Sequence, residues 1–220
     1  MISSALMIAE EAAQSVADSL GRSPLIAVVR TDSLEVARQQ AEELIAGGVA
    51  LVEITFTVPG ASSLVRELLA GRGSAAPPWI GMGSVTTRAR AEEAVAAESE
   101  FIVSPNAAAA VAEVARAAGR FLILGALTPT EIVAATELGA NLVKVYPLPA
   151  VGGPSYLRTV RGPLWEVDML AAGGFGVDEI PAYRAAGASA FGLAAPLLFG
   201  TEGSPGKNIA HALTLARGDR

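Results

Sequence analysis

The fold is decided by a pattern that first appears in residues 25–55, LIAVVRTDSLEVARQQAEELIAGGVALVEIT. Two short apolar runs, at 25–30 and 50–55, enclose a stretch at 33–46 that is rich in Ala, Glu and Leu, which are good helix formers. Ser33 stands where a helix begins, and the glycine pair at 47–48 stands where one ends. The segment therefore predicts a strand, a helix and a second strand.

The same unit recurs along the chain. Further apolar runs lie at 79–82, 101–103, 121–124, 141–146, 168–172 and 189–193, and the starts of the runs are 20 to 29 residues apart. Helix-like stretches at 88–97, 107–118 and 130–138 separate several of them. An open doubly wound sheet would need only about five or six such units. Eight repeats instead favour an α/β fold, a single closed (β/α)8 TIM barrel.

The segments that flank the repeats complete one predicted domain over residues 1–220. An N-terminal lead-in helix is expected at 1–21, because apolar residues from Leu6 to Leu20 recur at helical spacing and Gly21 suits a helix end. The barrel is expected at 22–200 and a helical tail at 201–220. The N-terminus has no basic region of the signal-peptide type, and no 18-residue apolar run is free of charges. We therefore expect no membrane association and a cytoplasmic protein.

Composition excludes several function classes. The net charge is −6 with no cluster of basic residues, so nucleic-acid binding is not expected. The chain has no cysteine and a single histidine, His211, which rules out disulfides, thiolate metal sites and histidine triads. We expect no metal and no cofactor. Hydrophobic residues make up 51% of the chain, which suits strands buried on both faces and leaves apolar surface for a subunit interface.

The clearest signal for chemistry is Lys144, in the apolar run LVKVY at 142–146. Only two of the 16 Lys and Arg residues are lysines, Lys144 and Lys207. Arginine keeps its proton, whereas a desolvated lysine can lose its own, and a neutral amine can attack a carbonyl to form an iminium. A lysine that snorkels from a strand edge or pairs with a carboxylate is the structural alternative.

Other polar residues are expected at the carboxyl ends of the strands, where barrel enzymes place their chemistry. Glu53 interrupts an apolar strand and can act as general acid and base; a salt bridge with Arg30 is its structural alternative. Arg30 can clamp a carboxylate in a bidentate fork. Gly173 and Gly174 can present backbone N–H groups to an anion, although a glycine pair is equally common in a plain turn.

Seven segments, in this order and spacing, resemble the family of 2-keto-3-deoxy-6-phosphogluconate (KDPG) and 4-hydroxy-2-oxoglutarate (KHG) aldolases. They are IAVVR (26–30), GGVALVEITFTVPGA (47–61), IGMGSVT (80–86), FIVSPN (101–106), LTPTE (127–131), LVKVYP (142–147) and AGGFGVDEI (172–180). The resemblance implies a metal-independent class I aldolase that cleaves a 2-oxo acid to pyruvate and an aldehyde such as glyceraldehyde 3-phosphate. It also implies a homotrimer.

The resemblance assigns roles to individual residues. Lys144 matches the Schiff-base lysine and Glu53 the residue that moves protons, while Gly83 and Ser84 match positions that bind the pyruvate carboxylate. Some family members place a carboxylate-binding arginine where this chain has Thr57, which makes Arg30 the expected anion partner here. The full set of expected substrate-binding residues is Arg30, Thr57, Gly83, Ser84, Thr128, Gly173 and Gly174.

The chain departs from the family pattern at three places. Met82 stands where an alanine is usual, Ala172 replaces a threonine, and Ala194 and Ala195 replace a Gly-Ser pair whose serine helps to bind phosphate. Met82 is expected to crowd the site, and the hydroxyls lost at Ala172 and at 194–195 put phosphate recognition in question. Two alternatives to a KDPG aldolase therefore stay open: an aldolase for an unphosphorylated 2-oxo acid such as KHG, and a non-covalent phosphosugar isomerase or ligand-binding barrel.

Overall fold

Eight parallel strands form a closed barrel in the computed structural model, which describes residues 4–72, 76–199 and 205–218. Each strand pairs with the next in sequence, and β1 pairs with β8 to close the ring. This confirms the predicted (β/α)8 barrel. The strands are β1 (Leu25–Val29), β2 (Leu51–Thr55), β3 (Trp79–Gly83), β4 (Phe101–Val103), β5 (Phe121–Ala126), β6 (Leu142–Val145), β7 (Met169–Ala172) and β8 (Ala190–Ala194).

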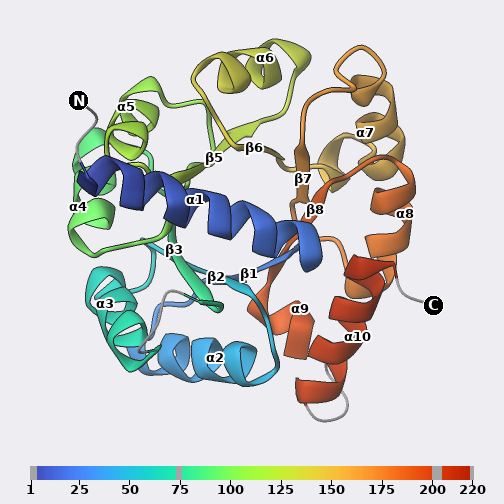
Figure 1. Cartoon of the computed structure of the whole chain (residues 1–220). Coiled ribbons are helices and arrows are strands. Elements are labelled where there is room, and N and C mark those ends of the chain that lie inside the picture. The colour runs from blue at the N-terminus through green and yellow to red at the C-terminus, as the bar shows by residue number, and fades with distance from the viewer. Residues whose placement is uncertain (1–3, 73–75, 200–204, 219–220) are drawn as a thin grey trace.

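Helices surround the strands and alternate with them along the chain, as Figure 1 shows. They are α2 (Leu34–Ala46), α3 (Ala61–Arg72), α4 (Arg88–Ala96), α5 (Ala109–Ala117), α6 (Pro129–Glu137), α7 (Gly153–Arg161), α8 (Ile180–Ala185) and α9 (Ala195–Phe199). Helix α10 (Pro205–Arg217) lies in the predicted helical tail, and helix α1 (Ser4–Arg22) precedes the barrel. Residues 1–3, 200–204 and 219–220 of the predicted flanking segments lie outside the described residues.

The predicted ends of several elements are off by one or two residues. Strand β5 continues to Ala126, two residues beyond the predicted run, and Arg30 lies just after β1 instead of within it. Helix α1 does not end at Gly21, because the N–H of Ser23 still donates to the Ser19 carbonyl at 2.9 Å. Glycine favours a helix end but does not impose one.

Alternate residues of each strand face two different cores. Leu51 belongs to the cluster that fills the barrel interior, whereas Val52 and Ile54 belong to the larger cluster between barrel and helices. On β6 Leu142 faces the interior in the same way and Val143 faces the helices. This alternation follows from the two-residue period of a strand. Both outer and inner faces are therefore apolar over most of the barrel.

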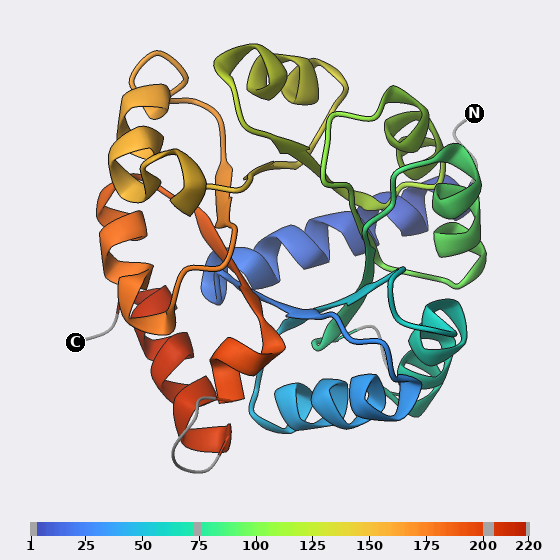
Figure 2. The same ribbon diagram turned by 180° about the vertical axis from the view of Figure 1, so that it is seen from behind.

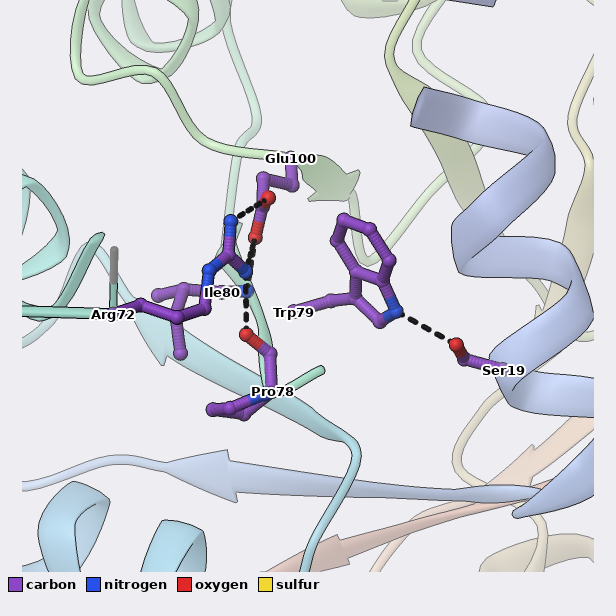
Figure 3. Close-up of polar contacts among 6 residues, drawn as sticks. All are labelled: Ser19, Arg72, Pro78, Trp79, Ile80 and Glu100. Atoms are coloured by element: carbon purple, nitrogen blue, oxygen red, sulfur yellow. Dashed lines mark hydrogen bonds and ion pairs between the residues drawn. The ribbon is translucent and has the colours of Figure 1, made fainter. Parts of the chain in front are cut away.

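Helix α1 lies across the amino-terminal end of the barrel (Figure 1). Its Val16 and Leu20 join the interior cluster, and the indole N–H of Trp79 donates to Ser19 Oγ at 2.8 Å. Beside Trp79, the Arg72 guanidinium forms two hydrogen bonds with the Glu100 carboxylate, at 2.8 and 2.5 Å (Figure 3). Figure 2 shows the opposite end, with α1 behind the strands. These contacts close one end of the barrel with protein.

Among the described helices, none has the length and apolar character needed to cross a membrane.

Candidate active site

Glu53 and Lys144 are brought together by strand geometry. Each stands two residues after a member of the interior cluster, Glu53 after Leu51 and Lys144 after Leu142. The two-residue period therefore aims both side chains into the barrel, one layer nearer its carboxyl end. Strands β2 and β6 stand four apart in the ring of eight, on opposite sides. Their side chains consequently approach each other across the interior.

The two charged groups lie in ion-pair range and out of bulk solvent. Lys144 Nζ is 3.8 Å from Glu53 Oε2, and the two side chains are 11% and 1% exposed. Neither Glu53 oxygen accepts a hydrogen bond from another described residue. Buried carboxylates without such partners are uncommon, because desolvation of a charge costs several kcal/mol. Glu53 thus pairs with Lys144 and not, as the structural alternative had it, with Arg30.

Glycine at position 83 makes room for Glu53. A Cβ atom there would lie 1.8 Å from Glu53 Oε1, closer than any real contact. Gly81 and Gly125 are likewise excluded from bearing a side chain, by the Phe101 ring and by the Pro105 backbone. Of the three glycines, Gly83 is the one whose missing side chain leaves the space that the Glu53 carboxylate occupies. The structure thus gives Gly83 a role that the sequence did not indicate.

Arg30 and Ser84 meet at the ends of β1 and β3. The Arg30 Nη2 group donates to Ser84 Oγ at 3.2 Å. Ser84 has a backbone φ of 60°, a left-handed conformation that L-residues other than Asn and Asp seldom adopt. Strained backbone of this kind is concentrated at functional sites, where the surrounding structure holds it in place. The predicted association of these two residues in one anion-binding region has a geometric basis.

Arg90 is a further basic residue at this place, and sequence reasoning missed it. Its Nη1 donates to the Ser84 carbonyl at 3.1 Å and to Thr86 Oγ1 at 3.2 Å, and its guanidinium lies over the Phe56 ring at 5.4 Å. Arg90 stands six residues after Ser84, in the first turn of α4. A search for basic residues in the first turn of the helix that follows each strand would have found Arg90.

Thr57 lies beside this region, beyond the end of β2. Its hydroxyl is 2.7 Å from Thr55 Oγ1, and Thr55 in turn donates to the Val29 carbonyl at 3.0 Å. Through the hydrogen bond from Thr55 to Val29, these two threonines link the end of β2 to the end of β1. Thr57 is exposed, and its predicted contact with substrate stays a prediction.

Thr128 caps helix α6. Its hydroxyl accepts the N–H of Glu131 at 3.4 Å and donates to Glu131 Oε2 at 2.9 Å, and the Thr128 N–H also donates to Glu131 Oε2 at 2.8 Å. Hydrogen bonds from the backbone N–H groups of Thr128 and Leu127 lower the pKa of the Glu131 carboxyl. Thr128 is therefore the N-cap of α6, and its predicted contact with substrate stays a prediction.

The two glycines after β7, Gly173 and Gly174, are required for different physical reasons. A Cβ on Gly173 would lie 2.9 Å from the Pro147 Cα atom, and its φ is 132°. Gly174 has a φ of 91°, and nothing lies within 4 Å of the place where its Cβ would be. The chain therefore turns tightly at Gly173 and is open to approach at Gly174.

Tyr146 is a second residue that the sequence did not single out for the site. The Lys144 Nζ atom lies 5.7 Å from the centroid of the Tyr146 ring, within the range of a cation–π contact. Tyr146 is 44% exposed, so its ring borders both the amine and solvent. The ring forms part of the boundary between the buried pair and the mouth of the barrel.

The arrangement combines a partly buried amine, a buried carboxylate and a basic region at the same end of one barrel. Such a set can bind an acidic substrate, form a covalent adduct with a carbonyl and move a proton beside it. Within residues 4–72, 76–199 and 205–218, no three metal-ligating side chains of the His, Cys, Asp or Glu type come together.

Comparison with known proteins places this geometry in a family. A model of the KDPG and KHG aldolase family matches residues 16–198. A 2-dehydro-3-deoxy-phosphogluconate aldolase of Treponema pallidum is 30% identical over 168 residues, which cover 76% of this chain and 79% of the relative. A probable 2-dehydro-3-deoxy-6-phosphogalactonate aldolase of Rhizobium meliloti is 33% identical over 175 residues, with 79% and 81% covered.

A solved structure of similar fold is the KDPG aldolase of Legionella pneumophila, in which pyruvate was captured as a covalent carbinolamine intermediate. It is 25% identical with a TM-score of 0.73, and the match covers 91% of this chain and 94% of that one. The family match spans nearly the whole barrel and includes both β2 and β6. The chain belongs to the KDPG and KHG aldolase family.

Proposed function

We propose that the chain cleaves KDPG to pyruvate and glyceraldehyde 3-phosphate, with Lys144 as the Schiff-base lysine and Glu53 as the proton carrier. As a family member the chain is a class I pyruvate aldolase, a carbon–carbon lyase that acts on a small molecule. The observation that carries the residue assignment is the buried pair itself, with Lys144 Nζ 3.8 Å from Glu53 Oε2. No described residue donates a hydrogen bond to the Glu53 carboxylate, so its oxygens are available to accept a proton from a substrate.

The chemistry follows from these two groups. Lys144 passes its ammonium proton to the Glu53 carboxylate, and the resulting amine adds to the C2 carbonyl of the substrate. Glu53 returns that proton to the carbinolamine hydroxyl, which leaves as water and gives an iminium. The Glu53 carboxylate then accepts the proton of the C4 hydroxyl as the C3–C4 bond breaks, and the iminium takes up the electron pair as an enamine. Glu53 returns a proton to C3, and water hydrolyses the resulting pyruvate iminium to free Lys144.

Two groups of residues in the site are assigned to the two anionic groups of the substrate. Arg30 and Ser84, which already contact each other at 3.2 Å, receive the carboxylate next to the ketone, with Gly83 and Thr57 beside them. Backbone N–H groups at Gly173 and Gly174 receive the distal phosphate, helped by the open space at Gly174. Thr128 completes the predicted set. Since Ala194 and Ala195 carry no hydroxyl, phosphate binding depends on the backbone.

Two properties of the intact protein belong to the same proposal. We expect a homotrimer in the cytoplasm, as the family resemblance implies, and an apolar chain composition is compatible with a subunit interface. Treatment with EDTA is expected to leave turnover unchanged, because the proposed electron sink is an iminium and not a metal ion. Strong inhibition by EDTA would contradict the proposal.

The experiment that tests the substrate is a comparison of kcat/KM on three compounds. KDPG is expected to be cleaved best, with KHG as the unphosphorylated alternative. The 6-phosphogalactonate analogue is the third compound, because the relative from Rhizobium meliloti is named for it. A higher kcat/KM on KHG would show that phosphate is not recognised and would overturn the substrate assignment. Absence of pyruvate from all three would overturn the aldolase proposal for this pair of residues.

A further inference from the structure

A polar cavity lies at the other end of the barrel from Lys144 and Glu53. Its volume is about 390 Å³, in the range of small-molecule sites. Helix α1 forms one wall, and the loops before β5 and β6 form the other. Figure 1 shows α1 crossing the barrel end with α5 and α6 on one side of it. The polar residues that line the cavity are Gln14, Arg116, Arg120 and Asn141.

Both charged residues of this cavity are arginines without a carboxylate partner. Neither Arg116 nor Arg120 forms an ion pair in the part of the chain that the structure describes, whereas Arg38, Arg72 and Arg88 each do. The Arg120 Nε atom is buried and has no hydrogen-bond partner there. Buried donors of this kind normally have an acceptor.

Arg116 extends from α5 to the cavity and lies against Gly139. It comes from the last turn of α5, and Gly139 stands at the start of the loop before β6. Gly139 has a φ of +84°, which favours glycine, and a Cβ there would be 2.9 Å from Arg116 Nε. The arginine thus reaches across from one strand–helix unit to the next.

Two amides add hydrogen-bond donors. Asn141 Oδ1 accepts the N–H of Leu122 at 2.7 Å, which fixes the amide and leaves its NH₂ group free to donate. Gln14 Nε2 donates one hydrogen to Asp18 Oδ1 at 2.8 Å and retains a second. The site therefore offers two guanidiniums and two amide donors, and among the side chains that the structure describes no acidic one lines it.

We infer that this cavity binds a small organic oxyanion, through its phosphate or carboxylate group, at a site separate from the aldolase centre. Planar guanidiniums match the geometry of both groups and bind them bidentately. Because α1 forms one wall, a bound anion would also tie α1 to the barrel and stabilise the folded chain.

Isothermal titration of the full chain with inorganic phosphate, and separately with malonate, tests the inference. Arg116→Gln is expected to weaken binding by about tenfold, and Arg116→Gln with Arg120→Gln to abolish it. The matched control is Arg66→Gln, which removes the same charge from an exposed position on α3 and is expected to leave the affinity unchanged. A response to only one probe would identify which of the two anions the site takes.

Equal affinities in the wild type, Arg116→Gln and the control would overturn the inference, as would absence of binding to the wild type. An equal loss in the control would also overturn it, because it would mark a general charge effect. Since Arg116 is exposed, its single substitution keeps the test valid if the double variant does not fold. Turnover of KDPG by Arg116→Gln is expected to stay at the wild-type rate, so failure here is distinguishable from failure of the proposed aldolase.

Discussion

Lys144 Nζ on β6 lies 3.8 Å from Glu53 Oε2 on β2, across the interior of the barrel. The two residues are 91 positions apart in the sequence (144 − 53 = 91), and neither strand neighbours the other. Closure of the ring between β1 and β8 is what places them face to face. Closure of the barrel therefore also brings the two residues of the candidate catalytic pair together.

Substitution of the carboxylate tests its role in proton transfer. Glu53→Gln keeps the size of the side chain and removes the proton acceptor, so exchange at the pyruvate methyl group is expected to slow by about 10²- to 10⁴-fold. NMR of pyruvate in D₂O measures this rate. Glu35→Gln, at an exposed position on α2, is the control and is expected to exchange normally. An unchanged rate in Glu53→Gln would remove Glu53 from the mechanism.

Substitution of Gly83 tests whether the shape of β3 positions the carboxylate. In Gly83→Ala the new Cβ would begin 1.8 Å from Glu53 Oε1, so the carboxylate must move. We expect a loss of stability of about 1–3 kcal/mol together with slow proton exchange. Gly21→Ala, where no atom lies within 4 Å of the new Cβ, is the control and is expected to be neutral or slightly stabilising. Wild-type exchange in Gly83→Ala would show that the carboxylate tolerates displacement.

Two substitutions of Ser84 separate its hydroxyl from its backbone conformation. Ser84→Ala and Ser84→Gly both remove the group that contacts Arg30, so both are expected to raise KM about tenfold or more. Only Ser84→Gly relieves the left-handed φ of 60°, and it is expected to be more stable than Ser84→Ala by about 1 kcal/mol. Steady-state kinetics and urea unfolding provide the two measurements. Equal KM values in all three proteins would exclude the hydroxyl from substrate binding.

The cap of α6 predicts a pH-dependent contribution to stability. The pKa of Glu131 is lowered in the folded chain, first by the backbone N–H of Thr128. Its stabilisation is therefore present above the ordinary carboxyl pKa of 4.5 and is lost as pH falls through the lower folded-state pKa. Thr128→Ala and Glu131→Ala are each expected to cost about 1 kcal/mol near neutral pH. For Glu131→Ala, urea unfolding in strongly acidic buffer should find no remaining difference from wild type; a difference that persists there would contradict the assignment.

Much of the fold was predictable because it depends on local sequence. Apolar runs and helix formers recur at a regular spacing, and Ser33 and Thr128 cap helices as their side chains predict. Element ends were less predictable: Gly21 lies inside α1, since the hydrogen bond from Ser23 to Ser19 continues the helix past it. A local preference sets where a helix tends to end, and tertiary packing decides where it does end.

The site was predictable in part. Lys144 and Glu53 break apolar strands, and each lies on the interior face because it stands two residues after an interior residue, Leu142 or Leu51. Contacts between distant segments left no local signal: the space that Gly83 leaves for Glu53, and the fold of Arg90 back onto Ser84, both depend on how neighbouring strands are placed.

Mass spectrometry after borohydride reduction with pyruvate tests the central claim most directly. The account predicts one pyruvate per chain attached to Lys144, with none on the exposed Lys207. It also predicts that Lys144→Ala folds, yet shows neither adduct nor turnover. An adduct on another residue, or full activity in Lys144→Ala, would contradict the account.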